Sequence, residues 1–195
     1  MVDQFWENIM KTWITKTIVV SACVLGIAGC ASPVDRIAEK PHCHTDRGRN
    51  AYCTKDPAPS IAKDDEAKLF ASVPEALTVY VVRYWGDGHH PLDISVDGGA
   101  AMETVPNSMI RLRLKEGTHQ ITFNVGGKTF DRTISGTKGE VRLLGITGTD
   151  YFWGKSSHQW TNDSVDQLKQ RALRSRLIKD ITLPVSYTHL RAHET

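Results

Sequence analysis

The chain has 195 residues, and its 24 Lys and Arg against 22 Asp and Glu give a formal net charge of +2. A balance so close to neutral lacks the basic excess on which nucleic-acid binding depends, so no nucleic-acid partner is expected. Hydrophobic residues make up 40% of the chain, which is enough to build the core of an ordinary folded domain. The composition therefore predicts a globular protein, and its segments are taken below in chain order.

The N-terminal residues 1–29 have the pattern of a signal peptide. An apolar run over 17–27 follows two lysines, and it is shorter than the ~20 residues of a membrane-spanning helix. Asp3 and Glu7 place negative charge where a signal peptide is normally positive. We therefore predict that translation starts at Met10.

Residues 25–30, LGIAGC, resemble the lipobox of bacterial lipoproteins. The resemblance implies that Cys30 carries a thioether-linked diacylglycerol, that the signal is cut before it, and that the new N-terminus is acylated, commonly with palmitate. In Gram-negative members an aspartate after this cysteine retains the protein in the inner membrane. Ala31 stands there in this chain, which implies the periplasmic face of the outer membrane. The alternative is an ordinary secretory signal with a chance cysteine.

Residues 30–63 are predicted to form a lipidated tether, because they are rich in proline, charge and small residues and have no apolar period. Cys43 and Cys53 remain as an even pair in an exported chain, which favours a disulfide that closes a small loop. His42 and His44 flank the first of these cysteines, so a zinc or copper site is the alternative. Adjacent residues of an extended chain point in opposite directions, and this favours the disulfide.

Residues 64–148 are predicted to form an antiparallel β-sandwich. A short helix over 64–72 opens the segment, because its acidic residues come first and complement the helix dipole. About seven short strands with alternating or β-branched patterns then follow at close spacing. The expected strands are 77–85, 92–99, 101–105, 109–117, 119–127, 128–135 and 140–146. The predicted fold class is therefore mainly β, with a C-terminal helix.

Residues 149–184 are predicted to contain an aromatic loop and then a helix over 162–181. The helix begins with a capping signal and acidic residues, and its cations come later. A basic face of this kind is either solvated or lies on anionic lipid headgroups. The tail 185–195, VSYTHLRAHET, resembles a translated sequencing adapter, and we exclude it as an artefact.

Three short motifs resemble an uncharacterised family of bacterial lipoproteins whose β-sandwich is similar to PEGA and carboxypeptidase-regulatory-like modules. These are YVVR at 80–83, VDG at 96–98 and the EGTH turn at 116–119, where Glu116 stands in place of a common proline. The resemblance covers about residues 64–146 and implies fold and location. The family has no assigned reaction, so the resemblance supplies no catalytic residues.

No nucleophile-elbow, zinc-protease or P-loop pattern occurs in the sequence, so we predict no catalytic residue, no metal and no cofactor. Histidines and aromatic residues in two expected loops form the candidate binding surface. Its members are His89, His90, Tyr151, Phe152, Trp153 and Trp160. If the aromatic residues are exposed, they form a platform for a sugar or a protein. If they are buried beneath the C-terminal helix, they close the core. The buried interpretation is favoured.

These observations lead to one functional hypothesis and two rivals. The hypothesis is a membrane-anchored lipoprotein, not an enzyme, with a binding or envelope-assembly role toward an envelope protein or a glycan. The first rival is a metal-binding protein or an enzyme that uses His42, His44, His89 and His90. The second is a structural lipoprotein that binds peptidoglycan.

Overall fold

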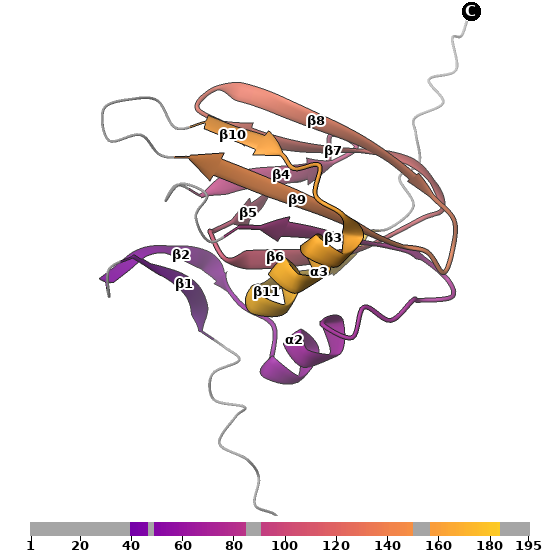
Figure 1. The fold of residues 1–195 in the computed structure, drawn as a ribbon, viewed down its shortest axis with the longest axis horizontal. Coiled ribbons are helices and arrows are strands. Elements are labelled where there is room, and N and C mark those ends of the chain that lie inside the picture. Colours follow the sequence, from indigo (N-terminus) through magenta and orange to yellow (C-terminus); the bar gives the residue numbers. More distant parts are fainter. Residues whose placement is uncertain (1–39, 47–48, 85–90, 150–156, 184–195) are drawn as a thin grey trace, which may run out of the picture. The chain divides into compact units, whose positions relative to one another are not determined.

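The structure is a computed structural model that describes residues 40–46, 49–84, 91–149 and 157–183. These residues form two larger sheets, one short hairpin and two helices (Figure 1). The hairpin pairs β1 (Pro41–Asp46) with β2 (Arg49–Pro57). The mainly β, sandwich-like fold confirms the predicted fold class.

The five-stranded sheet has the strand order β10-β9-β3-β6-β11. Its strands are β3 (Leu77–Arg83), β6 (Ser108–Leu114), β9 (Val141–Thr149), β10 (Ser157–Trp160) and β11 (Arg176–Thr182). The central strand β3 runs antiparallel to β6 but parallel to β9, and β11 runs parallel to β6. Every residue of β3 is buried, because both faces of the sheet are covered there.

The four-stranded sheet has the order β5-β4-β7-β8 and is antiparallel throughout. Its strands are β4 (Leu92–Val96), β5 (Met102–Thr104), β7 (Gly117–Val125) and β8 (Lys128–Gly136). Along β4, buried and more exposed residues alternate, as expected for a sheet with one face on the core and one toward solvent.

The main core lies between these two sheets. Apolar side chains from the inner faces of both sheets meet there, among them Val79, Ile94, Ile110, Phe123 and Ile146, all fully buried. A second apolar cluster covers the opposite face of the five-stranded sheet. Its members include Tyr80, Met109 and Leu177 from the strands, together with Ala67, Leu168 and Ala172 from the helices α2 (Ile61–Ala67) and α3 (Val165–Arg174). The fold therefore has three layers, with both helices on one side (Figure 1).

The predicted C-terminal helix is present but shorter than expected. A capping box starts α3, in which the Ser164 hydroxyl accepts from the Gln167 N–H and the Gln167 side chain accepts from the Ser164 N–H. The helix ends at Arg174, and Ser175 is extended at φ −89° and ψ 155°. The expectation of a helix to residue 181 was wrong, because residues 176–182 form β11, whose apolar side chains are buried on both faces of the sheet.

The strands expected over 77–146 are all present with small shifts at their ends. Their pairing is not purely antiparallel, since the five-stranded sheet contains the two parallel pairs described above. Two further differences concern β10, which was not predicted, and the β1–β2 hairpin, which forms inside the segment whose composition predicts a tether.

Candidate ligand pocket at the end of strand β3

The disulfide predicted between Cys43 and Cys53 is present in the β1–β2 hairpin, where the two residues lie directly opposite each other with their sulfur atoms 2.03 Å apart. Bonded sulfur atoms are not thiolates and do not serve as metal ligands in this form. Burial, followed by the charge of Arg176, lowers the pKa of His42, whose Nε2 is buried without a hydrogen-bond partner. Across the described ranges, no cluster of three His, Cys, Asp or Glu side chains is arranged to hold a metal ion.

Most of the predicted binding surface lies outside the described residues, namely His89, His90, Tyr151, Phe152 and Trp153. The exception is Trp160 in β10, which is half-buried. Its ring packs edge-on against Phe123 with 5.0 Å between ring centroids, and its Nε1–H donates to the Phe130 carbonyl at 3.3 Å. Trp160 therefore packs against the core between the two sheets and not beneath the C-terminal helix, where the buried interpretation expects it.

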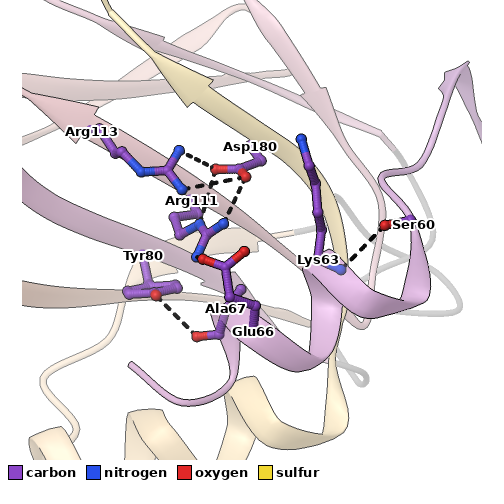
Figure 2. A network of polar contacts seen from close by, with 8 residues as sticks. All are labelled: Ser60, Lys63, Glu66, Ala67, Tyr80, Arg111, Arg113 and Asp180. Carbon is purple, nitrogen blue, oxygen red and sulfur yellow. Dashed lines mark hydrogen bonds and ion pairs between the residues drawn. The ribbon is translucent and has the colours of Figure 1, made fainter. Parts of the chain in front are cut away.

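An ion-pair network joins β6, β11 and α2 (Figure 2); its centre, Arg111 and Asp180, is buried, whereas the Glu66 side chain is exposed. Arg111 donates from Nη2 and Nε to the two carboxylate oxygens of Asp180, at 2.7 and 2.9 Å. Arg113 donates to the same carboxylate at 2.6 Å, and Glu66 accepts from Arg111 Nη1 at 3.0 Å. Burial acts to raise the pKa of Asp180, but hydrogen bonds from both arginines outweigh it and hold that pKa below its ordinary value.

Two further contacts tie α2 to the sheet beneath it. The buried carboxylate of Asp64 accepts from the backbone N–H of Leu177 at 2.7 Å and pairs with Lys68 Nζ at 2.8 Å. The phenol of Tyr80 donates to the carbonyl of Ala67, the last residue of α2, at 2.9 Å (Figure 2). The charged groups between α2 and the sheet described here therefore have partners within the protein, and they serve to fix the fold.

A different environment occurs at the edge of the sheet where β3 ends. A cavity of about 380 Å³ opens there, and among the described residues it is lined by Tyr84, Asn107, Arg171, Arg174 and Ser175. The topology brings these residues together because β6 begins where β3 ends, and β11 begins beside β6 in parallel register. The Asn107 N–H donates to the Tyr84 carbonyl at 3.4 Å, and the Arg176 N–H donates to the Asn107 carbonyl at 3.1 Å.

Tyr84 and Arg171 form a supported pair inside this cavity. The Arg171 guanidinium carbon lies 4.4 Å from the centroid of the Tyr84 ring, in a cation–π arrangement. The Tyr84 phenol donates to the carboxylate of Asp163. Burial and this hydrogen bond raise the pKa of Tyr84, so the phenol stays protonated and remains a donor. The ring is therefore held in place, and it positions the guanidinium above it.

The two arginines of the cavity have no carboxylate partner among the residues that the structure describes. Among the described residues, neither Arg171 nor Arg174 forms an ion pair, although both lie in the last turn of α3 and complement its dipole. Both side chains are exposed at the mouth of the cavity. With the Asn107 amide nearby, the arrangement offers several N–H donors and two positive charges to a ligand, which is the chemistry of an anion-binding site.

This pocket was not predicted from the sequence. The sequence pattern predicts a solvated or lipid-facing helix for the arginines and a strand position for Tyr84. The available signal was indirect: an aromatic residue, Tyr84, follows the β-branched run of 77–83, and Asn107 follows a proline. Tyr84 and Asn107 lie close to residues 171–175 because β11 pairs with β6 in parallel.

Comparison with models of known protein families gives no match to this chain, and comparison with curated proteins also gives none. In the part of the chain that the structure describes, neither α2 nor α3 has the length and apolar character required to cross a membrane.

Proposed function

We propose that this protein is a bacterial envelope lipoprotein, anchored through Cys30 at the periplasmic face of the outer membrane, with a non-catalytic binding role. The observation that carries the proposal is the coincidence of two independent marks of export. The LGIAGC motif specifies lipidation, and the Cys43–Cys53 disulfide needs an oxidising compartment to persist.

The geometry supports binding at one edge of the five-stranded sheet. The parallel strands β3 and β9 both end at this edge, at Arg83 and Thr149. The arginine-lined cavity lies at the same edge. A rigid sandwich with a cavity at one end of its strands is a common arrangement for recognition.

The test of the anchor is an intact-mass measurement on protein from the membrane fraction, comparing the wild type with Cys30→Ala. We expect a diacyl-sized excess mass that the variant lacks, and a gain of two hydrogens upon reduction of the disulfide. Absence of the lipid mass together with two free thiols would overturn the export proposal.

The location has its own test in Ala31→Asp. If the lipoprotein sorting rule applies, this variant moves from the outer-membrane to the inner-membrane fraction of a density gradient. Ala31→Ser is the matched control and stays with the wild type. Retention of Ala31→Asp in the outer-membrane fraction would contradict the proposed sorting.

A further inference from the structure

We propose that the cavity at the end of β3 binds a phosphate group, with Arg171 and Arg174 as its main ligands. The inference rests on the proposed binding role and names its chemistry. Arg171 and Arg174 line a formed cavity, and neither has a carboxylate partner among the described residues. Arg111 and Arg113, in contrast, share the carboxylate of Asp180.

The Arg171 side chain is held in position before any ligand binds. Arg171 is held over the Tyr84 ring, and that ring is fixed by its hydrogen bond to Asp163. The backbone of Arg171 is also fixed, because its carbonyl accepts from the Ser175 hydroxyl at 3.0 Å. A guanidinium positioned in this way loses less conformational freedom on binding an anion than a free surface side chain does.

Phosphate fits the donor set better than a carboxylate does. A carboxylate can serve two arginines, as Asp180 does for Arg111 and Arg113, but both of its oxygens are then shared between them. For the two arginines three residues apart on the last turn of α3, an acceptor with more oxygen atoms and more charge satisfies more of the N–H donors. A phosphate monoester provides three acceptor oxygens and close to two negative charges at neutral pH. The volume of about 380 Å³ also accommodates a small organic group attached to the phosphate.

The ligand has two possible sources with the same chemistry: a soluble phosphate ester or the headgroup of an anionic lipid. The experiment uses the full chain in a neutral sugar detergent and follows ³¹P line broadening. The probes are inorganic phosphate, glycerol 3-phosphate, and phosphatidic acid carried in the same micelles, with phosphatidylcholine as the zwitterionic reference.

We expect the wild type to bind the phosphate probes. The double variant Arg171→Gln with Arg174→Gln should weaken the affinity at least about tenfold, because it removes charge-assisted hydrogen bonds that contribute strongly to the binding free energy. The matched control is Lys138→Gln with Arg142→Gln. It removes the same charge from exposed side chains that pair with Glu116 and Glu140 and retains wild-type affinity.

The outcomes separate clearly. Binding of soluble phosphates and of phosphatidic acid supports a free-ester site, whereas binding of phosphatidic acid alone supports a headgroup site. Absence of binding, or equal loss in the pocket variant and in the control, overturns the proposal. Neither result depends on the mass of the lipid anchor, so failure here and failure of the lipoprotein proposal are distinguishable.

Discussion

Two pairs of arginines illustrate two uses of the same side chain in this molecule. Arg111 and Arg113 lie on β6, where both donate to Asp180, and the Arg111 side chain is only 5% exposed. Arg171 and Arg174 lie at the end of α3, open to solvent beside a cavity. The first pair closes a network inside the protein, whereas the second leaves its donors available to a ligand.

Both pairs consist of two arginines, so the type and number of charged residues do not by themselves distinguish an anion-binding site from a structural ion pair. A buried guanidinium requires a partner, because an unpaired charge in the interior costs several kcal/mol. An exposed guanidinium needs none, and it becomes useful when an aromatic ring positions it, as Tyr84 does for Arg171. The following predictions test this distinction, from the largest expected effect to the smallest.

Asp180→Asn should destabilise the fold by about 3–5 kcal/mol, because it removes the charge that balances two arginines in a buried network. Urea unfolding at neutral pH measures the change. The control is Asp93→Asn, at an exposed position of β4, which should stay within about 0.5 kcal/mol of the wild type. A loss no larger than that of the control would mean that the network contributes little to stability.

Acidification should reduce the stability difference between the wild type and Asp180→Asn. The folded protein holds the pKa of Asp180 below its ordinary value, so the stabilisation is complete above the unfolded pKa, near 3.9, and declines as pH falls through the folded pKa. Urea midpoints measured between pH 7 and about pH 2 test this. A constant difference across that range would show that Asp180 is not the titrating group.

Tyr84→Phe should cost about 1 kcal/mol, because it removes one hydrogen bond to Asp163 while it keeps the ring beneath Arg171. Equilibrium unfolding measures the loss. The ³¹P affinity should change less in this variant than in Tyr84→Leu, which removes the ring as well. Equal affinities for the two variants would argue against positioning by the ring.

Arg171→Gln with Arg174→Gln should change the free energy of unfolding by less than about 1 kcal/mol, since the variant loses only favourable interactions with the helix dipole and one exposed cation–π contact. Thermal unfolding by circular dichroism is the measurement, with Lys138→Gln and Arg142→Gln as reference. A loss of unfolding free energy comparable with that of Asp180→Asn would mean that Arg171 and Arg174 stabilise the fold, as Arg111 and Arg113 do.

The sandwich was predictable because its strands carry local signals. Alternation in 92–96 and 117–125 and the β-branched run of 77–83 follow from burial on one or both faces, and neighbouring residues encode it. Strand β11 lacks such a signal. Leu177 and Ile178 are adjacent and both buried because they face different layers, and basic residues precede them, so the segment resembles a continuing helix.

The pocket was not predictable from the sequence for a related reason. Its five described lining residues come from three separate segments, at 84, 107 and 171–175, and no short motif joins them. The sequence places Arg171 and Arg174 among the later cations of a helix over 162–181, whereas the helix ends at Arg174. The exposure of both arginines beside Tyr84 follows from tertiary contacts alone. The Cys43–Cys53 pairing, in contrast, was predictable from cysteine count and compartment.

The parallel pairing of β11 with β6 has a consequence for the order of folding. Asp180 lies 69 residues after Arg111 in the chain, so the buried arginines of β6 remain without their main acceptor until this late strand docks. Such long-range contacts slow folding, because the connecting chain must be ordered before the contact forms. A polypeptide with this topology completes its five-stranded sheet only after β11 has been synthesised and has docked beside β6.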